Sequence, residues 1–351
     1  MKTYRVAIYP GDGIGIEVME QALRLLDAVE AANGFATERL HLDWGVQRWE
    51  RTGDVAPPDM LDILRDQDAI LLGAVGWPAK LPDHVTLRPL VTIRQKFEQY
   101  TCIRPTRLLP GVRSVLADKG PEHIDFVVIR ENSEGEYVDS GSRFQVGEPG
   151  EIALQTAIHT RRGIDRILRF GFEMARKRRR QLTMVTKSNA LKYGYVLWDE
   201  CLERIAPEYP DVKADKMHAD AAAMNMVRWP ERFDVIVASN LFGDLLTDLA
   251  GIIGGGLGLA PSTNTNPERT YPSMFEPVHG SAPDIAGQGI ANPVAMFLST
   301  AMMLDWLGES TAAAQINRAI EKALADGCRT PDLGGDLSTS AMTDAVLDRL
   351  Q

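Results

Sequence analysis

The sequence has few cysteines and no long apolar run. Its three cysteines, Cys102, Cys201 and Cys328, are odd in number and far apart, which argues against a disulfide framework and against a thiolate metal site. No window of about 18 residues is both apolar and uncharged, so no membrane-spanning helix is expected. The first residues, MKTYRVAIYPGD, do not have the layout of a signal peptide. Together these absences predict a cytoplasmic protein.

Positive charge is also scarce. The chain carries 38 Lys and Arg against 48 Asp and Glu, a net charge of −10, so general attraction to nucleic acid or to an anionic membrane is not expected. One basic run, ARKRRRQ at 175–181, has two interpretations. It is either a nucleic-acid patch or the solvated C-terminal end of a helix, and we favour the second.

The pattern of elements indicates an α/β fold. With 351 residues, of which 44% are hydrophobic and 25% charged, the chain has the size of two globular domains. Short apolar runs predict strands at 5–9, 68–76, 125–130, 182–186 and 234–239. Helical patterns lie at 15–32, 57–66, 88–100, 161–178, 189–206, 216–228, 241–250 and 291–308. This alternation predicts a largely parallel sheet covered by helices on its faces.

Two segments interrupt this alternation. The glycines and the proline of 140–156 suit turns, and the segment is expected to form a hairpin arm. The glycine-rich piece at 251–262 is expected to be a backbone crossing between packed elements.

The stretch IYPGDGIGIEVMEQAL, 8–23, has the outline of a phosphate-binding turn: a strand, three glycines and a helix. A Rossmann fingerprint requires G-x-G-x-x-G and an acid about 20 residues later. Here Gly11, Gly13 and Gly15 give G-x-G-x-G, Ile16 occupies the third glycine's place, and the acid would be Glu38. The pattern therefore does not match, and another reason for this turn is needed.

The stretch SNLFGDLLTDLAG, 239–251, carries two carboxylates four residues apart. Asp244 and Asp248 would lie on one face of a helix and repel each other. A hard divalent cation such as Mg²⁺ or Mn²⁺ would relieve that repulsion; alternatively, both are solvated surface acids. Asp220 is a candidate third ligand.

Three arginines, Arg94, Arg104 and Arg130, stand in or beside elements with apolar flanks. Arginine binds carboxylates with two parallel hydrogen bonds, and open α/β sheets bind ligands beyond their strand ends. Three arginines near the acids would therefore suit a small dicarboxylate. Taken singly, each is equally explained by a salt bridge.

Possible proton-transfer groups follow two predicted strands. Tyr137 ends ENSEGEY (131–137), and Lys187 lies in VTKSNALKYG (185–194). Each matters for chemistry only if the fold brings it to the arginines. The long loop MFEPVHGSAPDIAGQGIANP, 274–293, offers backbone N–H groups and a carboxylate for ribose hydroxyls; otherwise it is an ordered surface loop.

In combination, these motifs resemble those of the isocitrate/isopropylmalate dehydrogenase family of β-decarboxylating dehydrogenases. Within it they are similar to the branch of tartrate dehydrogenase and D-malate dehydrogenase (decarboxylating). The resemblance covers nearly the whole chain. It is carried, in chain order, by the motifs GDGIGIE, LPDH, RPTRLLPG, RENSEGEY, TKSN, SNLFGDLLTDLAG and FEPVHGSAPDIAGQGIANP. The last two of these motifs are highly specific.

The resemblance implies an isopropylmalate-dehydrogenase-like two-domain fold whose dinucleotide site is not a Rossmann site. A large cofactor domain would comprise 1–100 and 253–351. A small domain, 101–252, would carry the substrate and metal residues, the dimer interface and the arm near 138–156. The glycine turn would lie beside the cofactor cleft, while the late loop would perform most of the dinucleotide recognition.

The resemblance also implies roles for individual residues. Arg94, Arg104 and Arg130 would bind the substrate carboxylates, and Asp244 and Asp248 would bind the metal. Asp220 and Lys187 would enter the same site from the other subunit of a homodimer with shared active sites. The positions matching NAD contacts are Glu276 near the nicotinamide, His279, Gly280, Ser281, Ala282, Asp284 and Asn292. A carboxylate at Asp284 would favour NAD by repelling a 2′-phosphate.

The implied reaction is oxidation with decarboxylation of a 2-hydroxy dicarboxylic acid. Mn²⁺ or Mg²⁺ would lower the pKa of the substrate hydroxyl, and K⁺ would be an activator. Lys187 would accept the hydroxyl proton, NAD⁺ would accept the hydride, and Tyr137 would protonate the carbon left by CO₂.

The sequence departs from the branch in DHVTLRPLVTIRQKF, 83–97, the segment that sets substrate choice in this family. The branch has Trp after the leucine, whereas this chain has Arg88 and Pro89. If Arg88 faces solvent, tartrate or D-malate is the expected substrate. If it meets a third carboxylate, isocitrate or homoisocitrate is expected. No apolar pocket for 3-isopropylmalate is evident in these residues.

Three other functional classes would use parts of the same set of residues. A metal-dependent hydrolase would use Asp220, Asp244 and Asp248 without needing the dinucleotide loop. A non-enzymatic ligand-binding protein would need the arginines but neither Lys187 nor Tyr137. An RNA-binding regulator is disfavoured by the net charge of −10.

Overall fold

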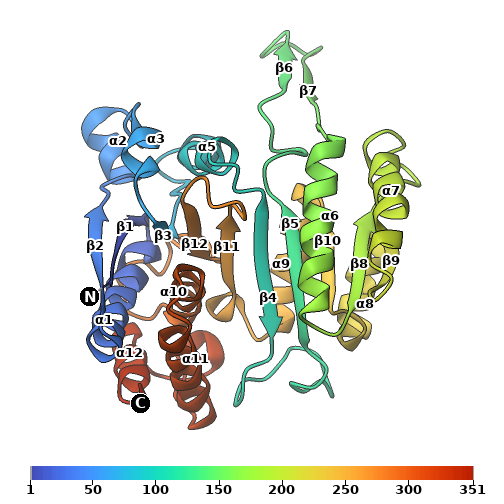
Figure 1. Ribbon diagram of the computed structural model, residues 1–351. Helices are drawn as coiled ribbons and strands as arrows, with labels where there is room; N and C mark the ends of the chain where they lie inside the picture. Colours follow the sequence, from blue (N-terminus) through green and yellow to red (C-terminus); the bar gives the residue numbers. More distant parts are fainter. Residues whose placement is uncertain (1, 351) are drawn as a thin grey trace.

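The computed structural model describes residues 2–350 and contains one large twisted sheet with helices on both faces (Figure 1). The strand order is β2-β1-β3-β12-β11-β4-β5-β10-β8-β9. The strands of this sheet are β1 (Lys2–Gly11), β2 (Phe35–His41), β3 (Ala69–Ala74), β4 (Thr101–Arg107), β5 (Asp125–Glu131), β8 (Gln181–Thr186), β9 (Lys213–His218), β10 (Val235–Ala238), β11 (Pro261–Thr265) and β12 (Ser273–Pro277). This confirms the predicted α/β class.

The sheet is parallel at both ends and antiparallel in the middle. β1, β2, β3 and β12 pair in parallel, as do β5, β8, β9 and β10. Between these groups, β11 is antiparallel to β12 and β4, and β4 is antiparallel to β5. The predicted parallel sheet is therefore correct for each end, while the centre joins the two ends by antiparallel strands.

Helices cover both faces of each end of the sheet. The helices are α1 (Ile14–Asn33), α2 (Val46–Thr52), α3 (Met60–Arg65), α4 (Asp83–Thr86), α5 (Arg88–Lys96), α6 (Arg161–Arg176), α7 (Gly194–Ile205), α8 (Ala219–Arg228), α9 (Asn240–Ile253), α10 (Val294–Leu307), α11 (Ser310–Ala325) and α12 (Thr339–Leu347). In β1, Val6 and Ile8 pack with α1, α10, α11 and α12, whereas Ala7 and Tyr9 pack with α3 and α5. Because successive side chains of a strand point to opposite faces, strands buried on both sides are apolar throughout.

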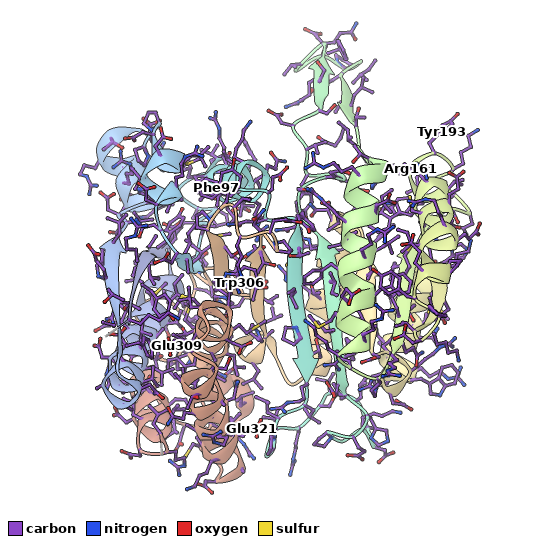
Figure 2. The ribbon with its side chains drawn as sticks, viewed as in Figure 1. Phe97, Arg161, Tyr193, Trp306, Glu309 and Glu321 are labelled. Carbon is purple, nitrogen blue, oxygen red and sulfur yellow. The ribbon has the colours of Figure 1, made fainter. Side chains whose placement is uncertain are left out.

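The hydrophobic clusters separate along the sheet. Two clusters draw on residues 4–109 and 259–346, and two others draw on residues 100–253, with α6 and α7 on one face and α8 and α9 on the other. In Figure 2, Phe97 and Trp306 mark the first end, and Arg161 and Tyr193 mark the second. The predicted domain limits, 1–100 with 253–351 for one domain and 101–252 for the other, stay a prediction.

Several predicted elements are confirmed with changed limits. The helix expected at 88–100 ends at Lys96, because Glu98 has a positive φ of 45°. The helix expected at 216–228 begins at Ala219, after strand β9. The helix expected at 189–206 begins at Gly194. The glycine-rich crossing at 251–262 leads into β11.

The segment at 140–156 forms the expected hairpin arm. β6 (Gly141–Phe144) pairs antiparallel with β7 (Ile152–Gln155), and the hairpin projects away from the sheet (Figure 1). Every residue of its two strands is exposed.

The basic run at 175–181 lies at the end of α6, and three of its arginines, Arg176, Arg178 and Arg179, form ion pairs. Arg176 contacts Asp211 at 2.8 Å, and Arg178 contacts the buried Asp234 at 2.8 Å. The position of the run at the end of α6 agrees with its interpretation as the C-terminal end of a helix. No helix between residues 2 and 350 is long and apolar enough to cross a membrane.

His159 makes stability depend on pH. It precedes α6, its ring lies 5.2 Å from the ring of Tyr195, and its Nδ1 accepts a hydrogen bond from Trp198 Nε1 at 3.2 Å. Burial lowers the pKa of His159. The unfolded chain therefore binds more protons than the folded chain as pH falls below about 6.5.

We expect the thermal unfolding midpoint to fall between pH 7.5 and 5.5, and to fall less in His159→Gln. Glutamine keeps an acceptor for Trp198 but does not titrate, so the difference between the two proteins isolates this histidine. Equal pH dependence of the two melting curves would contradict the assignment.

Candidate active site

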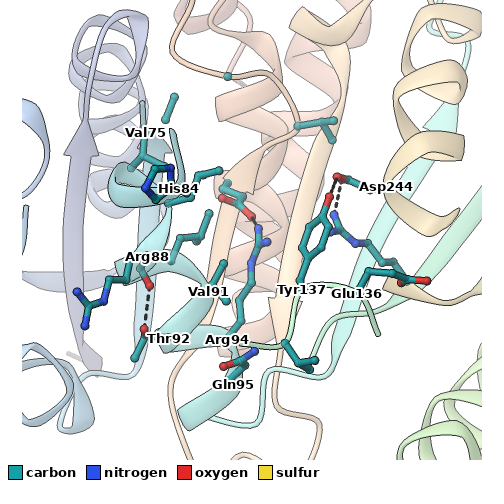
Figure 3. A pocket seen from close by; sticks show the side chains of 18 of the residues that line it. Val75, His84, Arg88, Val91, Thr92, Arg94, Gln95, Glu136, Tyr137 and Asp244 are labelled. Carbon is teal, nitrogen blue, oxygen red and sulfur yellow. Dashed lines mark hydrogen bonds and ion pairs between the residues drawn. The ribbon is translucent and has the colours of Figure 1, made fainter. Parts of the chain in front are cut away.

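A cavity of about 800 Å³ lies where the two ends of the sheet meet. One wall comes from the C-terminal part of β3, from α5 and from β12, and the other from β4, β5, α9 and the turn that carries Tyr137 (Figure 3). The three predicted arginines, Arg94, Arg104 and Arg130, all line it, although they come from three different elements.

Arg104 and Arg130 are brought together by strand register. Cys102 pairs with Arg130 and Arg104 pairs with Val128 across β4 and β5, so both arginines lie on one face of the sheet. Arg130 is 1% exposed, and its Nε and Nη2 donate to Asn240 Oδ1 at 3.1 and 2.6 Å. Helix α9 passes so close that a Cβ on Gly243 would lie 2.6 Å from Arg130 Cγ. Glycine at this position permits that approach.

Asp244 is the centre of the cluster. It forms ion pairs with Arg130 and, at 3.2 Å, with Arg104, and it accepts a hydrogen bond from the Tyr137 hydroxyl at 2.7 Å. Burial alone would raise the pKa of Asp244, but the two arginines and Tyr137 hold it below its ordinary value. Burial and Asp244 together raise the pKa of Tyr137. This phenol therefore stays protonated and can act as an acid.

Asp248 follows one helical turn after Asp244. Burial and the charge of Asp244 raise the pKa of Asp248. A divalent cation beside the two carboxylates would reverse this effect, and carboxylate oxygens are the ligands that Mg²⁺ and Mn²⁺ prefer. The donor set thus fits a hard cation. Among residues 2–350, however, no three acid, histidine or cysteine side chains gather into a metal-binding group.

The predicted third ligand, Asp220, lies elsewhere in the chain. It stands at the exposed start of α8, where its carboxylate pairs with Lys187 Nζ at 2.8 Å. Lys187 lowers the pKa of Asp220. The fold thus gathers Asp244 and Asp248 with the arginines, and it gathers Lys187 with Asp220 in a second place.

Arg94 connects the predicted substrate site with the predicted nicotinamide site. Its guanidinium pairs with Glu276 of β12, and both side chains are 9% exposed. Glu276 also accepts a hydrogen bond from Asn264 Nδ2 at 2.6 Å. A residue expected at the substrate carboxylates is therefore in direct contact with the acid expected beside the nicotinamide.

The loop at 279–292 rests on the glycine turn. The amide of Ile14 donates to Ser281 O at 2.8 Å, and the Ser281 hydroxyl donates to Gly76 O. A Cβ on Gly13, whose φ is +55°, would lie 2.0 Å from Ser281 O. The glycine turn at 11–15 therefore supports the loop at 279–292. This contact with the protein's own backbone is a reason for the glycines other than the Rossmann fingerprint.

The other predicted residues of this loop differ in their surroundings. Burial lowers the pKa of His279, whose Nδ1 contacts Gly280 O at 2.9 Å. Asn292 Nδ2 donates to Asp332 Oδ2 at 3.0 Å. Asp284 is exposed, and Ala282 has a positive φ of 37°.

Comparison with known proteins gives the class. A family model described as isocitrate/isopropylmalate dehydrogenase matches residues 5–346. The chain belongs to the isocitrate/isopropylmalate dehydrogenase family. It is 48% identical to D-malate dehydrogenase [decarboxylating] of Escherichia coli (strain K12), 47% to tartrate dehydrogenase/decarboxylase of Pseudomonas putida and 46% to 3-isopropylmalate dehydrogenase of Thermobifida fusca (strain YX), each over 99% of this chain and 98% of the relative.

A solved structure of the same family has the same fold. A crystal structure of isocitrate dehydrogenase from Methylococcus capsulatus superimposes with a TM-score of 0.90 at 37% identity, covering 99% of both chains. Members of the isocitrate/isopropylmalate dehydrogenase family are metal-dependent decarboxylating dehydrogenases, and this chain is an oxidoreductase of that class. The relatives thus support the dehydrogenase class over the hydrolase and the non-enzymatic binding protein.

Sequence reasoning missed some residues of this dehydrogenase site. Asp12 is buried, and its two oxygens accept from the amides of Val46 at 2.7 Å and Gly76 at 2.8 Å, which orders the turn beneath the loop. Asn264 and Asp332 were missed as partners of Glu276 and Asn292. A polar residue within an otherwise buried stretch was the available signal for Asp12 and Asn264.

Proposed function

We propose that the chain is an NAD-linked, Mn²⁺- or Mg²⁺-dependent enzyme that oxidises and decarboxylates a small 2-hydroxy dicarboxylic acid, with tartrate or D-malate as substrate. The observation that carries this proposal is the meeting of Arg94, Arg104 and Arg130 at one cavity beside Asp244 and Tyr137. Relatives of similar identity that are named for D-malate and tartrate support the substrate. K⁺ is proposed as an activator.

The arginines would bind the two substrate carboxylates, because a guanidinium matches a carboxylate with two parallel hydrogen bonds. Asp244 and Asp248, with Asp220 of a second subunit, would hold the cation. The chemistry the cation supplies is to lower the pKa of the substrate hydroxyl.

Two proton transfers are assigned to side chains. Lys187, also from the second subunit, would accept the hydroxyl proton, and NAD⁺ would supply the acceptor for the C2 hydride. Cleavage of the bond to the β-carboxylate then releases CO₂ and leaves its electron pair on the adjacent carbon. Tyr137 would donate a proton to that carbon, and its protonated state at the mouth of the cavity supports this role.

The loop at 279–292 is proposed as the NAD site, with Glu276, His279, Gly280, Ser281, Ala282, Asp284 and Asn292 as its contacts. Its support on the glycine turn favours a fixed loop conformation. Asp284 is exposed, so its carboxylate is open to a ribose hydroxyl.

Asp284→Ala should raise the KM for NAD by roughly tenfold, the loss of one or two charge-assisted hydrogen bonds. The KM for the hydroxy acid should change far less. Steady-state kinetics with each substrate varied in turn measures both, and Asp336→Ala, a change at another aspartate, serves as control. A larger effect on the hydroxy acid than on NAD would contradict the assignment.

A homodimer with shared active sites is proposed. Exposed apolar side chains lie on α8 and α9, the two helices that carry Asp220, Asp244 and Asp248, and a second copy would cover them. They are Met224 (69% exposed), Val227 (47%), Leu245 (61%) and Ile252 (44%). We further propose a cytoplasmic enzyme that has neither nucleic acid nor membrane as partner.

Arg88 gives the second candidate. It lines the cavity at the start of α5, but it is exposed and its guanidinium points away from Arg94 in Figure 3. A substrate whose third carboxylate reached Arg88 would be isocitrate or homoisocitrate. Leu90 and Val91, which also line the cavity, offer apolar surface for 3-isopropylmalate.

NADH formation with Mn²⁺ and K⁺ should be measured for D-malate, L- and meso-tartrate, 3-isopropylmalate, isocitrate and homoisocitrate. We expect the highest kcat/KM for D-malate or a tartrate, with Arg88→Ala having little effect. A preference for a tricarboxylate that Arg88→Ala abolishes would establish the second candidate instead.

A further inference from the structure

The turn that carries Tyr137 belongs to no helix or strand. It follows a short bridge in which Gly135 and Ile158 exchange backbone hydrogen bonds of 2.7 and 3.1 Å. Beyond this bridge the Tyr137 hydroxyl contacts Asp244, and the ring lies 5.3 Å from the Arg130 guanidinium. Tyr137 is 38% exposed, so little packing restrains it.

Gln155, the last residue of β7, fastens this turn from the side. Its Nε2 donates to Glu136 O at 3.0 Å and to Val138 O at 3.1 Å. A primary amide has two N–H groups, so each carbonyl receives one. The two carbonyls belong to the residues immediately before and after Tyr137. One side chain therefore holds the backbone on both sides of the tyrosine.

These two hydrogen bonds matter most when the site is in use. In the proposed function Asp244 would hold a cation, and the Tyr137 hydroxyl would then have to turn from Asp244 toward the substrate carbon. The hydrogen bond to Asp244 no longer restrains the tyrosine in that state. The bonds from Gln155 act on the backbone and are unaffected by this change.

We propose that Gln155 is a positioning residue, which holds Tyr137 where it protonates the substrate carbon. The inference rests on the proposed role of Tyr137.

Gln155 also connects the hairpin arm to the cavity. It pairs with Gly141 at the base of the hairpin, where Thr156 N donates to Ser140 O at 2.8 Å. The arm thus has a task at the cavity in addition to any contact with a partner.

The test compares Gln155→Leu with Gln145→Leu. Both changes replace an exposed glutamine of the arm, but Gln145 lies between β6 and β7, away from the Tyr137 turn. With D-malate as probe and enzyme in excess, the single-turnover rate of NADH formation should stay within about twofold in both variants. In Gln155→Leu the steady-state kcat should fall by about tenfold or more, because protonation follows hydride transfer and CO₂ release, and small misplacements of a reacting group have effects of this size.

The double variant Tyr137→Phe, Gln155→Leu separates positioning from general damage. If Gln155 acts through Tyr137, the double variant should have the steady-state kcat of Tyr137→Phe alone. A further multiplicative loss, or an unchanged kcat in Gln155→Leu, would overturn the proposal.

Hydrogen–deuterium exchange provides a readout that does not need activity. Amides of residues 135–140 should exchange faster in Gln155→Leu than in the wild type and in Gln145→Leu. Unchanged exchange would overturn the inference by itself. If the wild type formed no NADH with any acid tested, the proposed function would fail, and faster exchange would still show that Gln155 orders the turn.

Discussion

Lys187→Ala should lower NADH formation from the hydroxy acid by about 10²- to 10⁴-fold, the usual contribution of a general base. Decarboxylation of added oxaloacetate should remain measurable, because that step starts from the ketone and has no hydroxyl proton to remove. Lys187 directly follows β8, and its side chain pairs with the exposed Asp220. A solvent-exposed ion pair adds little to stability, so the variant should fold.

The two reactions are measured separately, NADH formation by absorbance and oxaloacetate loss in the absence of NAD. Lys192→Ala is the matched control, since Lys192 lies in the same loop and packs over Tyr193 at 5.1 Å. It should retain both reactions. If Lys187→Ala weakened both reactions equally through a higher KM, the lysine would be a binding residue, and the base would have to be sought elsewhere.

Mixing Asp220→Asn with Asp244→Asn should restore activity that neither variant has alone. Within one chain Asp220 is not gathered with Asp244 and Asp248. If Asp220 belongs to the partner's site, each homodimer lacks a ligand in both sites. A mixed dimer has one site with both aspartates and one with neither. It should therefore have about half the wild-type activity, and randomly reassorted chains about a quarter.

Differently tagged chains allow the mixed dimer to be purified and assayed. The control is a mixture of Asp244→Asn with Asp248→Asn, whose aspartates share one helix, α9. That mixture should gain nothing, because every site then lacks one ligand. A mixed Asp220/Asp244 dimer that forms but stays inactive would refute the shared site. Melting temperatures should also be compared, since Asp244→Asn removes the carboxylate that faces the buried Arg104 and Arg130.

Much of the fold follows from local sequence. Apolar runs such as DFVVIR and DVIVAS indicated β5 and β10, since strands buried on both faces are apolar throughout. The central strands β4 and β11 were missed for the opposite reason. Arg104 in β4 lines the cavity. Ser262 and Asn264 in β11 are polar because they hydrogen-bond to Arg104 and to Glu276, which line it.

In the active site, the relative position of the two carboxylates on α9 follows from local sequence alone. The spacing of Asp244 and Asp248 places both on one face of α9, because a helix repeats every 3.6 residues. Tertiary structure decided the rest. It brought Arg94, Arg104 and Arg130 to one cavity, separated Asp220 from the other acids, and placed Gln155 beside the Tyr137 turn. Helical period and strand alternation act over a few residues, whereas contacts between distant elements depend on strand order and register in the folded sheet.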